Sequence, residues 1–116
     1  MSKDNRLSPR VRTEPINVRI QCHVGSIPAY ISNLSDRGAR IHLEEKLEDN
    51  NLTLIIPMID ENEPPLEIKS ECVRAEQDKE YHLNIIGVLF TEISQAQKDK
   101  IIILMEHHRK NKAAKS

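Results

Sequence analysis

Apolar and polar residues alternate along several short stretches of the chain, which is the pattern of strands with one buried face. The alternation is clear over residues 16–22, 39–43, 52–58 and 66–72, and turn-forming residues separate these stretches. We expect six strands, over residues 16–22, 27–34, 39–43, 52–58, 66–73 and 81–90. The last is nearly continuous in apolar residues, so we expect it to be buried on both faces. Six short strands separated by turns predict a sandwich or a barrel.

The pattern changes at Ser94, after which apolar residues recur at helical spacing. Ser94 and Gln97 have the sequence of a capping box, in which each side chain bonds to the other residue's backbone. We expect a helix over residues 95–109 that packs on the strands through one apolar face. That face consists of Ala96, Ile101, Leu104, Met105 and His108. The expected fold class is therefore all-β with a C-terminal helix.

The length of 116 residues suits one domain with one modest core. Aromatic residues make up only 3% of the chain, so the core must consist mostly of Ile, Leu and Val. We divide the chain into a flexible N-terminal arm (1–15), a barrel with its helix (16–110) and a disordered tail (111–116). No apolar run is long enough to span a bilayer or to form the core of a signal peptide, so we predict a cytoplasmic protein.

Charge is unevenly distributed, although the net charge is only −1. Residues 1–19 and 97–116 are basic, whereas the segment between them is acidic. An acidic body repels a nucleic-acid backbone, so we do not expect general nucleic-acid binding. A small nucleic-acid-binding barrel that uses its basic ends stays as an alternative, but few aromatic residues are present to stack on bases.

The residues that usually carry catalysis or bind metals show no such arrangement. The five histidines lack the spacing of a zinc site, so no metal is expected. Ser35 precedes Asp36 without a nucleophile-elbow sequence, and we predict that the protein is not an enzyme. Cys22 and Cys72 lie far apart and are expected to be small buried apolar groups; a disulfide or a reactive thiol is the alternative.

Two arginines in the N-terminal segment are better candidates for function. Three residues separate Arg6 from Arg10, and Pro9 among them argues against an ordinary helix interior. A guanidinium group matches a phosphate, or the O6 and N7 edge of guanine, through two parallel hydrogen bonds. A flexible arm with two such groups would suit a small ligand that carries both phosphates and guanines.

Arg6-x-x-x-Arg10, followed by Asn33-x-Ser35-x-x-Gly38, resembles the motif of the PilZ domain, the bacterial receptor module for cyclic di-GMP. The resemblance continues in "RGARIHL" and in "IIGVLFTEIS", and so covers nearly the whole chain. It implies a six-stranded antiparallel barrel capped by a C-terminal helix. This agrees with the six strands and one helix expected from the hydrophobic pattern.

The resemblance also implies roles for individual residues. Arg6 and Arg10 would close over cyclic di-GMP, whereas Asn33, Ser35 and Gly38 would form the surface that receives a guanine. Asn33 stands where the family more often has Asp. Its amide oxygen still accepts from guanine N–H groups, but without charge assistance, so weaker binding is expected.

Two further arginines adjoin these motifs. Arg12 lies outside the matched pattern and is a candidate auxiliary phosphate contact, or a solvent-facing residue before the first strand. Arg37 precedes Gly38, where it would either add a phosphate contact or obstruct the surface.

The resulting hypothesis is a non-enzymatic cyclic di-GMP receptor that needs no cofactor. Its arm would close over the ligand and change the surface offered to an effector protein that the sequence does not identify. The alternative is a PilZ-like adaptor that works through protein contacts and does not bind cyclic di-GMP.

Overall fold

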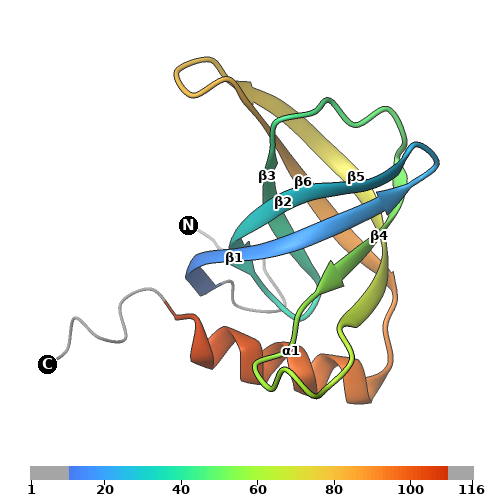
Figure 1. The fold of residues 1–116 in the computed structure, drawn as a ribbon, viewed down its shortest axis with the longest axis vertical. Coiled ribbons are helices and arrows are strands. Elements are labelled where there is room, and N and C mark those ends of the chain that lie inside the picture. Colours follow the sequence, from blue (N-terminus) through green and yellow to red (C-terminus); the bar gives the residue numbers. More distant parts are fainter. Residues whose placement is uncertain (1–10, 110–116) are drawn as a thin grey trace, which may run out of the picture.

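Within residues 11–109, which the structure describes with side chains from Thr13 on, six antiparallel strands close into a barrel. A C-terminal helix covers one end of the barrel in this computed structural model (Figure 1). The elements are β1 (Val11–Cys22), β2 (Gly25–Leu34), β3 (Gly38–Leu43), β4 (Asn51–Ile56), β5 (Leu66–Asp78), β6 (Leu83–Glu92) and α1 (Gln95–His107). The expected fold, an antiparallel six-stranded barrel with a C-terminal helix, is confirmed.

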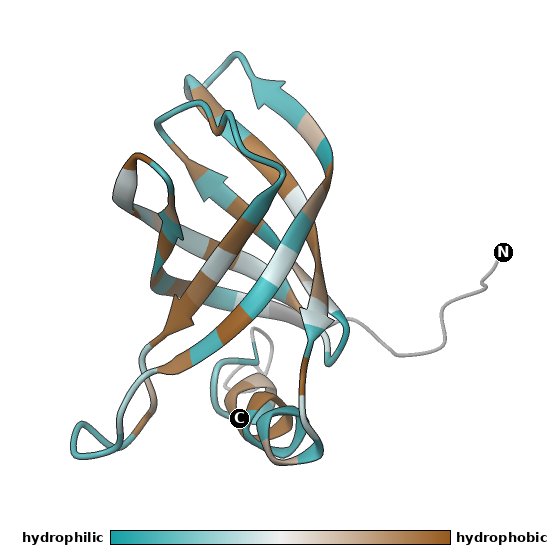
Figure 2. Cartoon of the chain, turned by 90° about the vertical axis from the view of Figure 1, so that its right-hand side faces the viewer, coloured by the Kyte–Doolittle hydropathy of each residue, from teal (hydrophilic) through white to brown (hydrophobic). Residues whose placement is uncertain are grey.

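Around the barrel the strands follow the order β1, β2, β3, β6, β5, β4, and β4 pairs with β1 to close it. Side chains therefore alternate between the closed interior and the outer surface. Figure 2 shows this alternation as brown and teal positions along the strands. The interior residues form one core that is mostly Ile, Leu and Val, as the composition predicts.

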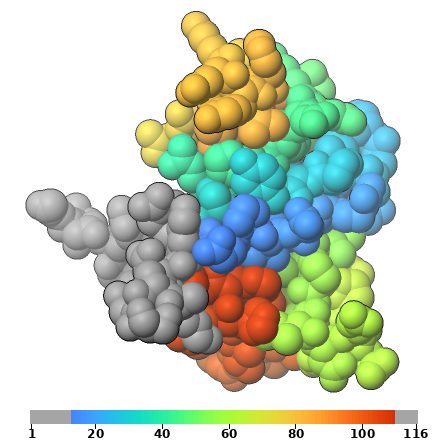
Figure 3. All heavy atoms as spheres, turned by 60° about the vertical axis from the view of Figure 1, so that its left-hand side comes forward, coloured from blue at the N-terminus to red at the C-terminus, as the bar shows by residue number. Residues whose placement is uncertain are grey.

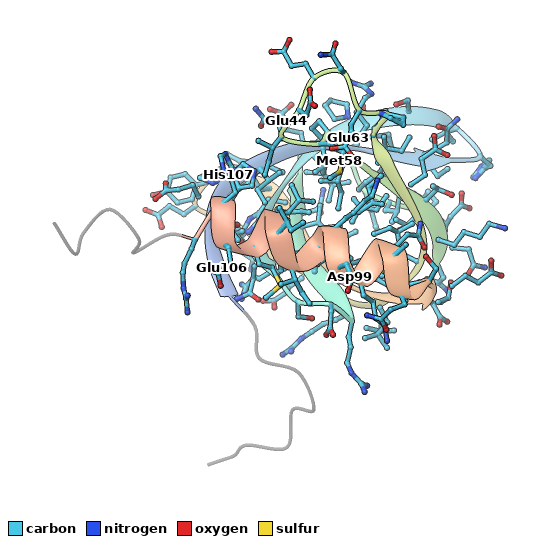
Figure 4. All side chains as sticks on the ribbon, turned by 90° about the horizontal axis from the view of Figure 1, so that it is seen from below. Glu44, Met58, Glu63, Asp99, Glu106 and His107 are labelled. Atoms are coloured by element: carbon cyan, nitrogen blue, oxygen red, sulfur yellow. The ribbon has the colours of Figure 1, made fainter. Side chains whose placement is uncertain are left out.

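The helix begins with the expected capping box. Ser94 Oγ accepts a hydrogen bond from the backbone N–H of Gln97 at 3.1 Å, and Gln97 Oε1 accepts one from the backbone N–H of Ser94 at 3.0 Å. Ile101, Leu104 and Met105 are buried in the barrel core, so the predicted apolar face is confirmed at these positions. Seen from below, α1 spans the end of the barrel, with His107 near one end of the helix (Figure 4).

Ala96 was expected on the apolar face but is exposed. It lies in the first turn of α1, where Gln97 makes the contact with the barrel. Gln97 Nε2 donates to the carbonyl oxygen of Glu67 on β5 at 2.9 Å. The first turn is thus attached through a polar bond, and the apolar contact begins one turn later.

The first and fifth strands are longer than the hydrophobic pattern predicts. β1 begins at Val11 and continues through Pro15. Its pairing with β2 shifts register between Arg12 and Ile16, and this irregularity accommodates the proline. Proline has no backbone N–H to donate to the ladder of hydrogen bonds, so within a sheet it is tolerated at irregularities of this kind, where the pairing is interrupted. β5 continues to Asp78 through residues that are mostly exposed, so no apolar alternation marks this part of the strand.

The sixth strand is buried on both faces only at Ile85 and Ile86, so the expectation of burial on both faces is wrong for the rest of the strand. Val88 is 1% exposed inside the barrel, whereas Leu89 is 45% exposed on the outside. Tyr81 and His82 precede the strand in a turn, where His82 has a φ of 58°. Leu89 is exposed because α1 covers the end of the barrel and leaves the outer face of β6 uncovered at this position.

The two cysteines are free and pack half-buried against the core, so they do not form the alternative disulfide. Among the residues that the structure describes, no cluster of His, Cys, Asp and Glu could hold a metal ion. Within the same residues, no helix is long and apolar enough to cross a membrane.

Candidate functional site

The turn between β2 and β3 is organised by the hydroxyl of Ser35. Ser35 is 3% exposed, and its Oγ accepts hydrogen bonds from the backbone N–H groups of Arg37 at 3.1 Å and Gly38 at 3.2 Å. The backbone N–H of Ser35 donates to the carbonyl oxygen of Gly38 at 2.9 Å. The serine of the predicted motif therefore holds the shape of this turn.

Gly38 is required by the approach of a neighbouring strand. A Cβ at this position would lie 2.1 Å from the carbonyl oxygen of Val88 on β6, which is a collision with backbone. Next to it, the carbonyl oxygen of Arg37 accepts from the backbone N–H of Phe90 at 2.8 Å, while Arg37 itself is exposed. The glycine of the motif thus lets the turn pack against β6.

A β-bulge turns two consecutive polar residues of β2 toward the outside. Ile31 pairs with Ile41, but the next pair on β3 is Asn33 with Arg40, so Ser32 is the additional residue. Bulges of this kind redirect side chains next to functional sites. The amide oxygen of Asn33 is buried and accepts no hydrogen bond from any residue within 13–109.

Asn33 lies in a row of directly paired positions that crosses five strands. Arg12 of β1 pairs with Asn33, Asn33 with Arg40 of β3, Arg40 with Gly87 of β6, and Gly87 with Arg74 of β5. We call these five positions the arginine row. Directly opposite residues of paired strands lie about 5 Å apart, so the row brings together basic residues that are distant in the sequence.

A second cross-strand pair lies beside this row. Tyr30 and His42 are stacked with ring centroids 4.6 Å apart and planes 2° from parallel, and His42 Nε2 lies 2.7 Å from Ser32 Oγ. Burial lowers the pKa of His42, the charge of Arg40 lowers it further, and Asp78 opposes both effects. His42 Nδ1 is buried and has no hydrogen-bond partner in the part of the chain that the structure describes.

These residues surround a hollow of about 430 Å³ on the outer surface of the barrel. It is lined by Thr13 and Pro15 of β1, by Tyr30, Ser32 and Asn33 of β2, and by Arg40 and His42 of β3. Figure 3 shows this side of the molecule, where β1, β2 and β3 succeed one another above α1. Guanidinium, amide, hydroxyl and imidazole groups meet here, so the hollow offers donors and acceptors for a polar, anionic ligand.

The start of β1 is attached to the end of α1 as well as to β2. The backbone N–H of Glu14 donates to the carbonyl oxygen of His108 at 2.9 Å, and Thr13 forms an antiparallel bridge with Arg109. In Figure 3 the first part of β1 accordingly lies between β2 and the helix. The hollow and the C-terminal end of α1 therefore share the same short stretch of β1.

The sequence matches the PilZ domain family over residues 4–107. The chain belongs to this family. No protein of curated function matches the sequence.

Solved structures share the fold of this PilZ domain at low sequence identity. The PilZ domain of YcgR from Escherichia coli, solved with c-di-GMP, has a TM-score of 0.69 and 11% identity, covering 90% of this chain and 92% of that one. MotI (DgrA), the inhibitor of motility from Bacillus subtilis, has a TM-score of 0.72 and 19% identity, covering 90% of this chain and 50% of that one. The MrkH–c-di-GMP complex from K. pneumoniae has a TM-score of 0.65 and 14% identity, covering 90% and 51%. This chain thus spans about half the length of MotI and MrkH.

Of the predicted site residues, the structure brings Asn33 and the backbone of Arg12 together across β1 and β2. Ser35 and Gly38 form the adjoining turn, and Arg37 is exposed on it. Arg6 and Arg10 lie outside the described residues.

Sequence reasoning missed Tyr30, Ser32, Arg40 and His42 as members of this site. Arg40 and His42 alternate with buried residues of β3, which signals that both point outward. The pattern of one strand cannot say which residues lie opposite on the next, because that depends on register and on the bulge at Ser32.

Proposed function

We propose that this PilZ domain binds cyclic di-GMP in the hollow between β1, β2 and β3. The observation that carries the proposal is the buried amide oxygen of Asn33, which has no donor among the described residues. A buried acceptor without a partner costs about 1–3 kcal/mol. The N–H groups on the edge of a guanine would satisfy this oxygen, so ligand binding would recover that cost. The complexes of YcgR and MrkH with c-di-GMP support the choice of ligand.

Arginines would supply the remaining contacts. Arg40 is exposed beside Asn33, and its guanidinium suits the O6 and N7 edge of a guanine or a phosphate. Arg6 and Arg10 of the family motif would close over the ligand from the N-terminal side. Arg12, whose backbone pairs with Asn33, would be an auxiliary phosphate contact. Arg37, which is exposed on the β2–β3 turn, would lie at the rim of the ligand site.

Ligand binding would act on an effector protein through the N-terminal segment. Closure of this segment over the nucleotide would alter the start of β1, which is bonded to the end of α1 through Glu14 and His108. The surface around that junction would then differ between the free and bound states. This gives a small binding module without catalysis a route to signal.

Calorimetric titration tests the proposal directly. Cyclic di-GMP should bind to the wild type, and cyclic di-AMP should not, because adenine lacks the N1–H donor and the O6 acceptor. Asn33→Ala should weaken binding about tenfold, the equivalent of one lost hydrogen bond of about 1.5 kcal/mol. Asn62→Ala, on an exposed loop residue, is the matched control. Absence of binding heat for the wild type would refute the proposal and favour the ligand-free adaptor.

A further inference from the structure

Ser32 is not part of the Asn33-x-Ser35-x-x-Gly38 motif, yet its side chain lines the same hollow as that of Asn33. Neighbouring residues of a regular strand point to opposite faces of the sheet, so two of them can share one hollow only where the strand is irregular. The β-bulge at Ser32 supplies this irregularity. The fold thus presents a hydroxyl group and an amide from consecutive residues on one wall of the hollow.

The imidazole ring of His42 is held against Ser32 by two contacts. Its Nε2 lies 2.7 Å from Ser32 Oγ, and the ring stacks on Tyr30 with centroids 4.6 Å apart. Together, the stack and the hydrogen bond fix the plane of the ring. Among the described residues, Ser32 Oγ is bonded to His42 alone. The direction of the Ser32 O–H bond therefore depends on which ring nitrogen of His42 carries the proton.

The surroundings of His42 determine where that proton lies. Burial lowers the pKa of His42, the charge of Arg40 lowers it further, and Asp78 opposes both effects, so the ring is neutral above pH 6.5. A neutral imidazole has one N–H donor and one bare acceptor nitrogen. Nδ1 is buried without a partner in residues 13–109, and a buried N–H without an acceptor is rarer than a buried acceptor without a donor. The proton therefore lies on Nε2, which donates to Ser32 Oγ.

A hydroxyl group that accepts a hydrogen bond from His42 keeps its own proton free to donate. This proton points away from Nε2, and Ser32 lines the hollow, so the O–H group is offered to a ligand there. Asn33 Oδ1, on the next residue, is a buried acceptor without a donor in the part of the chain that the structure describes. The two residues therefore present one donor and one acceptor to the same ligand.

A guanine base carries the complementary pair of groups. Its O6 accepts and the adjacent N1–H donates, whereas adenine has a donor at N6 and an acceptor at N1. The donor of Ser32 and the acceptor of Asn33 match guanine at both positions and adenine at neither. O6 has two lone pairs, so it can accept from Ser32 and also from an arginine that binds N7.

We infer that Ser32 donates to O6 of a guanine of cyclic di-GMP and that His42 is the positioning residue that orients its hydroxyl group. The inference rests on the proposed function, because it assigns a further specificity-determining residue to the same site. NMR of the imidazole nitrogens tests the His42 tautomer in the free protein, without any ligand. Nε2 should be protonated and Nδ1 bare, with the signals identified by their loss in His42→Gln. A proton on Nδ1 would overturn the inference.

Calorimetric titration tests the contact of Ser32 with the base. Ser32→Ala should raise the Kd for cyclic di-GMP about five- to tenfold, the usual effect of one lost hydrogen bond. Ser26→Ala is the matched control, because Ser26 is exposed on the same strand outside the hollow and should bind like the wild type. Cyclic di-IMP, whose base keeps O6 and N1–H but lacks the N2 amine, should lose as much affinity in Ser32→Ala. A loss for cyclic di-GMP alone would place Ser32 on the N2 amine and overturn the assignment to O6.

Substitutions at His42 separate positioning from a purely structural role. His42→Gln keeps an N–H donor at a similar reach and should bind like the wild type, whereas His42→Leu should raise the Kd about as much as Ser32→Ala. Because His42 acts through Ser32, His42→Leu should cause no further loss in the Ser32→Ala background, and additive losses would contradict the positioning role. If Ser32→Ala binds like the wild type while Asn33→Ala still weakens binding, the inference fails and the proposed function stands. A wild type that binds no cyclic di-GMP would refute both.

Discussion

Glu14 donates its backbone N–H to the carbonyl oxygen of His108 at 2.9 Å, which joins the start of β1 to the C-terminal end of α1. Two residues earlier, Arg12 pairs with Asn33 on the other side of the strand. The same short stretch of backbone therefore contacts the proposed ligand site and the helix. The backbone that is bonded to the end of α1 thus also borders the hollow.

Hydrogen exchange should detect this connection. We expect cyclic di-GMP to slow exchange of the Glu14 amide, because closure of the N-terminal segment would hold the start of β1 more firmly. Amides of β4, between Asn51 and Ile56, serve as an internal control, because the residues that line the hollow lie on β1, β2 and β3. Amide-resolved exchange with and without ligand measures the effect. Protection confined to β2 and β3, with Glu14 unchanged, would contradict coupling through this junction.

Gly38→Ala should destabilise the protein by about 1–3 kcal/mol, the usual range for forcing extra atoms into a packed site. The new Cβ would lie 2.1 Å from the carbonyl oxygen of Val88, so β3 and β6 would have to move apart. Urea unfolding measures the loss. Gly87→Ala is the matched control, since its Cβ meets only an ordinary contact. Equal stability of the two variants would show that Gly38 is not needed for strand approach.

Ser35→Ala and Asn33→Ala should affect different properties. Ser35→Ala leaves the N–H groups of Arg37 and Gly38 without their acceptor, so it should lower the free energy of unfolding by about 1–3 kcal/mol. Asn33→Ala removes a buried oxygen that has no partner among the described residues, so stability should stay constant or rise while ligand affinity falls. Thermal unfolding and calorimetry of both variants separate the two effects. A large loss of stability in Asn33→Ala would be inconsistent with an unpartnered amide oxygen.

His42 should make stability depend on pH. Burial and then Arg40 lower its pKa below the ordinary value of 6.5, so the unfolded chain binds a proton more readily than the folded chain. The contribution to stability is present above pH 6.5 and is lost as the pH falls through the folded pKa. His108 is shifted in the same direction by burial and by His107, so His42→Gln should reduce the slope of stability against pH without abolishing it.

Urea unfolding between pH 7.5 and 5 measures this slope. His82→Asn is the control, because His82 is exposed and Asn tolerates its positive φ of 58°. Equal slopes in the wild type and His42→Gln would contradict the assignment.

Arg10→Ala should weaken cyclic di-GMP binding at least tenfold, because a charge-assisted hydrogen bond is worth about 1.5–3 kcal/mol. Arg19→Ala, on β1, is the control. Arg19 lies outside the hollow, and its Nε donates to Ser26 Oγ near the β1–β2 turn. Titration calorimetry compares the two. An unchanged dissociation constant for Arg10→Ala would remove it from the proposed site.

Local sequence patterns predicted most of the fold because they record which face of each element is buried. Alternation located four of the six strands and a nearly continuous apolar run located the sixth, while Ser94 with Gln97 marked the start of α1 through a bond between near neighbours in sequence. The hydrophobic pattern gave wrong strand ends or wrong burial where a strand continues without a buried face, or where an apolar residue points to solvent. The end of β5 is exposed, and Leu89 is an apolar residue on an uncovered outer face.

By itself, the sequence determined the barrel, the helix and the motif residues Asn33, Ser35 and Gly38. Tertiary structure decided what those residues do. Ser35 stabilises a turn, and Gly38 allows β6 to approach closely. Asn33 is paired with Arg12 on one side and with Arg40 on the other. Neither the arginine row nor the stack of Tyr30 on His42 is visible in the sequence. The physical reason is that strand register and β-bulges set which distant residues become neighbours, and both depend on how all six strands close around one core.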